Sequence, residues 1–530
     1  MATSTTLQKI GFASFIMMAS VFASRVIGLV RESAIAWAGG AKASVDAYQI
    51  AFILPEILNH VVASGFLSIT FIPIFAHYLS QNRDKEGYQI FSIIFNGFGL
   101  MLIGFIAITM VWTPEFVMLL VPGIQDPKTF DLAVKMTRII IPAQFFFFSG
   151  GLFMAVQFTK EKFFIPALAP LVYNLGIIIG GVFLYPYLGM EGFAWGVLGG
   201  AFSGSFLLQY MGARRAGLQY FFIFNLFHPD FLKYILLTIP LMLGLTMTFS
   251  TEILMKFFGS FLGEGSIAAM NYAIRIMFIL VGFFGQAVGM ASYPFMAKIA
   301  ATGDLQRLNN MINQTLKFIF LVIPFSVLFM VLRHEIVMLL FQRGAFDTQA
   351  TQITAGILPY FMAGAFAFSA QTIVSRGYYA LQNTLFPAIF STLCVLASLP
   401  MIYGFMKILG IKGVALGLTI SVTLSSLLLF ECWSRKSQNN QKNEVYLFFL
   451  KLIPATLILG IILQVIYLGL AKMLDPSAPV PGLIICTITG LAFLFLLPAI
   501  GYVLGIKEIH ILYDKIFRRI IPWKKNKAPE

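Results

Sequence analysis

Long apolar stretches alternate with short polar segments along the whole chain. Each stretch holds about 20 residues or more, the length that a helix needs to cross the hydrocarbon core of a bilayer. Helices are expected because a spanning segment must satisfy its own backbone polar groups, and the stretches lack the polar alternation of barrel strands. The sequence therefore predicts an all-α polytopic membrane protein with fourteen transmembrane helices, over residues 10–37, 45–79, 88–112, 129–159, 163–185, 191–212, 230–258, 265–299, 309–332, 348–380, 385–405, 411–433, 446–471 and 480–505.

The composition agrees with this class. Hydrophobic residues make up 59% of the 530 positions and charged residues 11%, whereas ordinary globular domains contain about 25% charged residues. The polar segments are short and carry no catalytic or nucleotide-binding motif, so we expect a transporter without enzyme activity or cofactor. Neither a disulfide framework nor a metal site is predicted, because the three cysteines lie far apart in apolar stretches: Cys394, Cys432 and Cys486.

The net charge is +14, and its distribution along the chain matters more than its sum. Cytoplasmic loops of membrane proteins carry an excess of Lys and Arg. If the N-terminus is cytoplasmic and the helices alternate, these residues are about three times as frequent on the cytoplasmic side as on the other. The pattern predicts that both termini are cytoplasmic, and it explains the basic charge without a nucleic-acid partner.

The chain repeats itself at a spacing of about 221 residues. Glu115-Phe-Val-Met-Leu-Leu120 returns as Glu335-Ile-Val-Met-Leu-Leu340, and Gly189-Met-Glu-Gly returns as Gly410-Ile-Lys-Gly. Because the spacing covers an even number of helices, both copies have the same orientation, as in transporters built from parallel repeats. The predicted domains are two pseudo-symmetric six-helix lobes, a C-terminal helix pair and an amphipathic basic cytoplasmic tail, over residues 1–217, 218–440, 441–506 and 507–530.

The arginines that direct the functional prediction lie inside predicted transmembrane helices: Arg25, Arg31 and Arg275. A cation at the bilayer centre costs roughly 3 kcal/mol on insertion scales, so such residues usually face a polar cavity. Arginine also suits phosphate, because its planar fork donates paired hydrogen bonds. We therefore predict an anion-binding cavity. For Arg25 and Arg275 the alternative is an internal salt bridge. For Arg31 there are two alternatives: its side chain reaches the membrane–water interface, or it pairs with Glu32 or with a neighbouring helix.

Further polar residues in the apolar stretches are secondary candidates for the cavity wall: Glu32, Asp46, Glu56, Asn59, His60 and Asn174. Glu56 and His60 are one helical turn apart and either pair or line the cavity. Asp46 opens a helix, where capping is the main alternative, and Asn174 has helix-to-helix hydrogen bonding as its alternative. Glu252 is one helical turn from Lys256, and this spacing predicts an ion pair between them. The alternative is that Glu252 is a proton or sodium site.

Several segments resemble the MurJ (MviN) family of lipid II flippases, within the multidrug/oligosaccharidyl-lipid/polysaccharide exporter superfamily. The segments are Ser24-Arg-Val-Ile-Gly-Leu-Val-Arg-Glu32, Val45-Asp-Ala-Tyr48, Ile165-Pro-Ala-Leu-Ala-Pro170, Tyr272-Ala-Ile-Arg275 and Leu340-Phe-Gln-Arg-Gly-Ala-Phe346. The first of them is the most specific. The resemblance covers most of residues 10–435.

The resemblance implies fourteen helices and a bacterial plasma membrane protein that moves lipid II to the outer leaflet by alternating access. Lipid II is a disaccharide-peptide on an undecaprenyl diphosphate. By the same resemblance, Arg25, Arg31 and Arg275 engage the diphosphate and headgroup, and helices 13 and 14 form a groove for the lipid tail. We expect membrane lipids as the other partners and a monomer.

The chain departs from the family pattern at five positions: Glu56, Asn59, His60, Ser64 and Ile274. These departures make the cavity less cationic, and they leave the exact lipid-linked substrate and the energy source (membrane potential, sodium or protons) open. Two other transport functions stay possible, a flippase for another polyprenyl-diphosphate oligosaccharide and a drug/cation antiporter of the same superfamily. A glycosyltransferase is disfavoured because the predicted outer loops are short.

Overall fold

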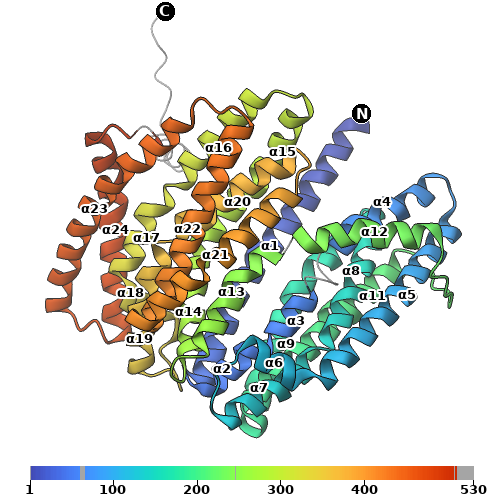
Figure 1. The fold of residues 1–530 in the computed structure, drawn as a ribbon, viewed down its shortest axis with the longest axis horizontal. Coiled ribbons are helices and arrows are strands. Elements are labelled where there is room, and N and C mark those ends of the chain that lie inside the picture. Colours follow the sequence, from blue (N-terminus) through green and yellow to red (C-terminus); the bar gives the residue numbers. More distant parts are fainter. Residues whose placement is uncertain (1, 60–65, 245, 507, 510–530) are drawn as a thin grey trace, which may run out of the picture. The chain divides into compact units, whose positions relative to one another are not determined.

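The computed structural model describes residues 2–59, 66–244, 246–506 and 508–509. All regular elements in these ranges are helices, which confirms the predicted class (Figure 1). The chain forms two compact units, Met1–Asn271 with Phe341–Ala350, and Tyr272–Leu340 with Thr351–Glu530. The predicted lobe boundary at residue 217 remains a prediction from the repeat.

The helices of the first unit are α1 (Ala2–Gly39), α2 (Ala43–Ala51), α3 (Ile53–Leu58), α4 (Phe66–Ser80), α5 (Asp84–Val111), α6 (Thr113–Leu120), α7 (Pro127–Ile140), α8 (Ala143–Thr159), α9 (Phe164–Leu188), α10 (Glu191–Gly200), η2 (Ala201–Leu207), α11 (Leu208–Arg215), α12 (Pro229–Gly244) and α13 (Thr246–Gly259). The first turns of α14 (Ser266–Val281) also belong to this unit.

The second unit continues α14 and contains η3 (Gly282–Ala287), α15 (Val288–Ala301), α16 (Leu305–Ile319), α17 (Val322–Val331), most of α18 (Arg333–Phe341) and of α19 (Thr348–Met362), α20 (Ala365–Ala380), α21 (Leu385–Leu409), α22 (Ile411–Lys436), α23 (Lys442–Met473) and α24 (Pro479–Val503).

Within the described residues, each of the fourteen predicted stretches overlaps one helix or consecutive helices. Within the described ranges, nine helices are long and apolar enough to cross a membrane. A tenth span results if α19 and α20, which are bent by 43° at their junction, count as one. The predicted count of fourteen spans therefore stays a prediction.

The sequence repeat reappears in the helix bounds. α9 and α21 begin and end about 221 residues apart. Each is followed by a glycine in the left-handed region, Gly189 with φ 57° and Gly410 with φ 59°. Because side chains are disfavoured at such φ values, glycine is the residue that ends both helices in this way.

Close backbone packing joins α9 to α10 in the first unit. A Cβ atom on Gly176 would lie 2.4 Å from Cα of Gly200, and one on Gly180 would lie 2.5 Å from Cα of Gly196. These separations are too short for any side chain. Gly196 and Gly200 of α10 therefore serve helix packing, as is typical of membrane helices.

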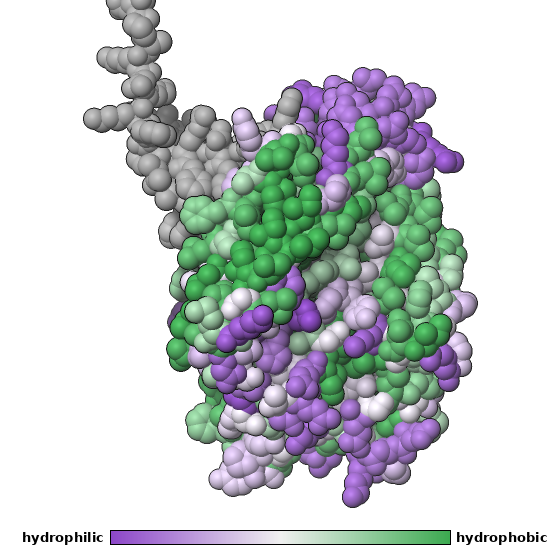
Figure 2. All heavy atoms as spheres, turned by 90° about the vertical axis from the view of Figure 1, so that its left-hand side faces the viewer, coloured by the Kyte–Doolittle hydropathy of each residue, from purple (hydrophilic) through white to green (hydrophobic). Residues whose placement is uncertain are grey.

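The C-terminal helices α23 and α24 pack against each other and against α17. Hydrophobic side chains gather on the face drawn in Figure 2, on which these helices lie. Leu457 and Ile461 on α23 and Phe495 on α24 are all more than half exposed. Such a face suits contact with lipid, because large exposed apolar surfaces are rare on soluble monomers.

Candidate functional site

A polar stripe on α1 faces α9. Ser24 and Arg31 are seven residues apart, which places them on one side of a helix. Ser20, one turn before Ser24, donates a hydrogen bond to the carbonyl oxygen of Ala167 on α9. The same stripe therefore fixes how α1 packs on α9 and directs Arg31 toward Asn174.

Arg31 binds two partners at once. Its Nη1 donates to Oδ1 of Asn174 at 3.0 Å, and its Nη2 donates to Oε1 of Glu32 at 2.5 Å. Glu32 is buried and Arg31 is half-buried, so each neutralises the other's charge where water is scarce. Both of the pairings expected for Arg31 occur together. Two of the five N–H donors of the guanidinium are used in these bonds, which leaves donors for another acceptor.

Asn174 is itself held in place. Its Nδ2 donates to the carbonyl oxygen of Pro170 at 2.8 Å and to Oγ of Ser24 at 3.4 Å. These bonds leave Oδ1 directed at Arg31. Tyr48 of α2 and Tyr173 of α9 lie near the Arg31 guanidinium. The described cluster thus joins α1, α2 and α9.

A second ion pair joins α3 to α13. Nζ of Lys256 lies 3.3 Å from Oε2 of Glu56. Lys256 is 1% exposed, so this carboxylate compensates a fully buried cation. Glu252 is half-buried on α13, and Asn59 is half-buried at the end of α3. His60 and Ser64 lie outside the described residues.

Asp46 binds the N-terminus of α14. Its carboxylate accepts from the backbone N–H of Gly265 at 2.6 Å and from that of Ala268 at 2.7 Å. The N-terminal N–H groups of a helix lack partners within the helix, and they favour a negative charge. Asp46 is buried and caps a helix that is distant in sequence.

The other two candidate arginines are Arg25 and Arg275. Arg25 is exposed and lies six residues before Arg31 on α1, which rotates it by about 240° around the helix axis. Arg275 is half-buried on α14, in the second unit. Among the predicted site residues of the first unit, hydrogen bonds join Arg31, Glu32 and Asn174.

Sequence reasoning missed Ser24, Tyr48 and Tyr173 as members of the cluster. Ser24 is separated from Arg31 by two helical turns, and this spacing is a usable signal. Tyr173 precedes a predicted site residue, whereas nothing local marks Tyr48. Within the described ranges, no group of three His, Cys, Asp or Glu side chains is arranged to hold a metal ion. The three cysteines are free and half-buried.

Comparison with known proteins identifies the family. Residues 35–474 match the family model described as lipid II flippase MurJ. The lipid II flippase MurJ of Burkholderia cenocepacia is 28% identical over 453 residues, which cover 82% of this chain and 86% of that protein. A probable lipid II flippase MurJ of Rhizobium tropici is 27% identical over 419 residues, covering 77% of this chain and 78% of that one.

Solved structures agree with this result. A lipid II flippase MurJ in an inward closed conformation superposes with a TM-score of 0.71 at 25% identity, covering 96% of this chain and 99% of that chain. An inward-facing multidrug resistance MATE family transporter of the MOP superfamily shares the fold, with a TM-score of 0.65 at 16% identity and coverage of 79% and 96%. On the family match over most of its length, this chain belongs to the MurJ lipid II flippase family.

Proposed function

We propose that this protein moves lipid II from the inner to the outer leaflet of a bacterial plasma membrane by alternating access, with both termini in the cytoplasm. The observation that carries the proposal is the MurJ family match over residues 35–474, together with relatives named as lipid II flippases. A diphosphate headgroup does not cross hydrocarbon unaided, because burying unpaired charge costs many kcal/mol. A flippase must therefore supply replacement partners inside the membrane.

Arg31 is the residue best prepared for this role. In the structure, Glu32 and Asn174 accept hydrogen bonds from two of its donors. A diphosphate carries more negative charge and more acceptor oxygens than a carboxylate, so it competes with Glu32 for the guanidinium. The exchange keeps Arg31 paired in both states, which avoids the cost of an uncompensated buried cation.

Other parts of the chain have supporting roles in the proposal. Arg25 and Arg275 contact the diphosphate or the headgroup, and Glu252 is a candidate for ion coupling. The apolar face of α23 and α24 holds the lipid tail during transport, since its exposed side chains match hydrocarbon. The protein acts as a monomer.

The departures at Asn59, His60, Ser64 and Ile274 favour one second candidate, a flippase for a different polyprenyl-diphosphate oligosaccharide. The same arginines would bind the same diphosphate in that case. Only the sugar and peptide part of the substrate would differ, so the two candidates are separated by the headgroup transported.

The test is complementation of a bacterium depleted of its own flippase, with lipid II in the outer leaflet assayed directly. We expect growth with the unaltered chain and loss of both growth and outer-leaflet lipid II with Arg31→Ala. Arg31→Lys should also be impaired, because an ammonium cannot reproduce the planar fork. The control is Arg435→Ala, which removes an exposed arginine paired with Glu431 on the surface and should leave transport unchanged. Normal outer-leaflet lipid II with Arg31→Ala would overturn the role of this residue.

A further inference from the structure

A charged face on α7 lies where lipid is expected. Asp131, Lys135 and Arg138 are spaced by four and three residues, so they share one face of the helix, and all three are exposed. The opposite face is buried and contains Ala133 and Met136. α7 opens the segment Pro127–Thr159, which is long and apolar enough to cross a membrane. The charged face lies in the first turns of this segment, the part of a spanning helix that is closest to the lipid headgroups.

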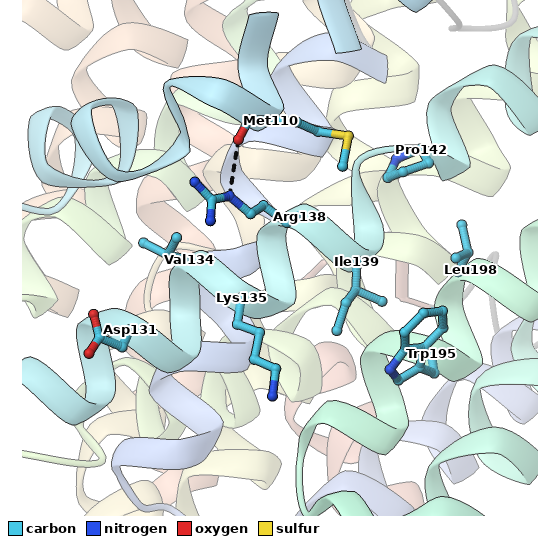
Figure 3. Close-up of a pocket in the computed structure, with 9 residues that line it drawn as sticks. All are labelled: Met110, Asp131, Val134, Lys135, Arg138, Ile139, Pro142, Trp195 and Leu198. Atoms are coloured by element: carbon cyan, nitrogen blue, oxygen red, sulfur yellow. Dashed lines mark hydrogen bonds between the residues drawn. The ribbon is translucent and has the colours of Figure 1, made fainter. Parts of the chain in front are cut away.

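This face opens onto a cavity of about 530 Å³ within the first unit. The cavity lies between α7 and α10 at the end of α5, as Figure 3 shows. Apolar side chains form most of its wall, among them Val134, Ile139 and Leu198. Trp195 is 45% exposed beside them. Tryptophan favours the membrane–water interface, so the cavity combines the features of a headgroup site and an acyl-chain site.

Arg138 is anchored so that its terminal nitrogens remain available. Its Nε donates to the carbonyl oxygen of Met110 at 3.0 Å. Met110 is in the last turn of α5, where carbonyl groups lack helical N–H partners. In the described part of the chain, Nη1 and Nη2 of Arg138 donate no hydrogen bond. These two nitrogens are the donors with which arginine holds a phosphate.

The charges around the cavity indicate which phosphate compound fits. Nζ of Lys135 lies 2.8 Å from Oε1 of Glu191, and this pair is neutral. The other two charges are the Arg138 cation and the Asp131 carboxylate. Within the described residues, the Asp131 carboxylate makes no ion pair. The net charge is zero, with one positive and one negative group open to a ligand. This balance matches a zwitterionic headgroup better than an anionic one.

We propose that the cavity binds a phospholipid whose headgroup carries both a phosphate and a primary amine, such as phosphatidylethanolamine. Arg138 binds the phosphate, Asp131 accepts hydrogen bonds from the ammonium group, and the acyl chains follow the apolar wall. A lipid is favoured over free phosphate because the wall is apolar and the neighbouring surface of α5 exposes Phe105 and Ile108. The site is independent of the proposed transport function.

The repeat confines this site to the first half. Gln352, Gly356 and Pro359 stand in α19 where α7 has Asp131, Lys135 and Arg138. None of these three carries a charge. A duplicated helix therefore has the lipid site in one copy alone, which is expected of an added function rather than of the shared scaffold.

The test is native mass spectrometry of the purified full-length protein with added phosphatidylethanolamine, phosphatidylcholine or phosphatidylglycerol. We expect the unaltered protein to retain phosphatidylethanolamine preferentially, because the trimethylated amine of phosphatidylcholine donates no hydrogen bond. Arg138→Gln should reduce its retention about tenfold through loss of charge-assisted bonds. Asp131→Asn should shift the preference toward phosphatidylglycerol. The control is Lys407→Gln, which removes an exposed cation on α21 that contacts the ring of Tyr403.

Two results would overturn the proposal. One is equal retention of the three lipids by the unaltered protein, which would indicate adventitious lipid. The other is an Asp131→Asn variant with unchanged selectivity. Asp131 is exposed and asparagine keeps its shape, so this second variant carries the test even if Arg138→Gln fails to fold.

Discussion

The helices α6 and α7 of the first unit and α18 and α19 of the second occupy matching places in the repeat, yet they hold charge differently. Glu115 on α6 is exposed, whereas its counterpart Glu335 on α18 is 0% exposed. Oε1 of Glu335 accepts a hydrogen bond from the hydroxyl of Tyr467 on α23 at 2.9 Å. The C-terminal helices have no counterpart in the first half. The carboxylate is therefore buried in the copy that these helices cover.

The positions of Lys135 and Glu191 also hold charge differently in the two halves. In the first unit Lys135 pairs with Glu191. In the second unit their counterparts are Gly356 and Lys412, and the side chain of Lys412 lies over the glycine, within 3.5 Å of where a Cβ would be. Duplication has kept the backbone and its turns, while the ionic contacts have changed according to what each face meets.

Among the variants that test this comparison, the largest change in stability is expected at Glu335. Glu335→Ala removes the bond from Tyr467 and leaves a cavity, which together should destabilise the protein by about 2–4 kcal/mol. Glu115→Ala should change stability by at most about 0.5 kcal/mol, because that side chain is exposed. Thermal unfolding of both purified variants in the same detergent measures the difference. Equal shifts would contradict the view that α23 and α24 give Glu335 its environment.

A smaller effect is expected at the α9–α10 contact. Gly176→Ala places a methyl group against the backbone of Gly200 and should cost about 1–3 kcal/mol through overpacking. The counterpart of Gly176 in the second half is Ala397, and there Ser398 and Ser421 join α21 to α22 by a 2.8 Å hydrogen bond.

The control for the glycine variant is Gly199→Ala on α10, where no atom from another part of the described chain lies within 4 Å of an added Cβ. That variant should be neutral or slightly stabilising, since alanine is the better helix former. An unfolding midpoint for Gly176→Ala equal to that of Gly199→Ala would show that α9 and α10 are not in close contact.

The smallest effect is expected at the caps of α7 and α19, which the two halves share. Asp126 accepts a hydrogen bond from the backbone N–H of Thr129, and Asp347 accepts one from that of Ala350. The hydrogen bonds from the side chain and backbone of Thr129 lower the pKa of Asp126. Its contribution to stability is therefore present above the unfolded pKa of about 4 and is lost as pH falls through the lower folded value.

Asp126→Asn should remove that part of the pH dependence and only slightly lower the unfolding midpoint at pH 7, because asparagine also caps helices well. Unfolding midpoints between pH 7 and pH 3 for the variant and the unaltered protein test this. Identical pH profiles would show that the cap contributes nothing.

The sequence predicted the fold well because its signals are local or periodic. The length of the apolar stretches marked the helices, and the returning motif at Glu115 and Glu335 revealed the repeat. The pairing of Arg31 with Glu32 was among the expected alternatives because the two residues are adjacent. These features depend on spacing along one segment, which a single sequence contains.

The rest of the site depends on contacts between distant segments. Lys256 pairs with Glu56, and Asp46 caps α14, each across some 200 residues of sequence. No local pattern selects these partners over nearer ones. Likewise, the rotation of α1 that leaves Arg25 exposed and turns Arg31 toward α9 follows from packing, because two arginines six residues apart look equivalent in a hydrophobic stretch.

The most direct measurement of the central claim is transfer of lipid II across liposomes that contain the purified protein. Lipid II and a polyprenyl diphosphate with another oligosaccharide are assayed side by side, with the unaltered protein, Arg31→Ala and Arg435→Ala. We predict that the unaltered protein and Arg435→Ala transfer lipid II and that Arg31→Ala does not. Transfer by Arg31→Ala at the unaltered rate, or transfer of the other lipid alone, would contradict the account.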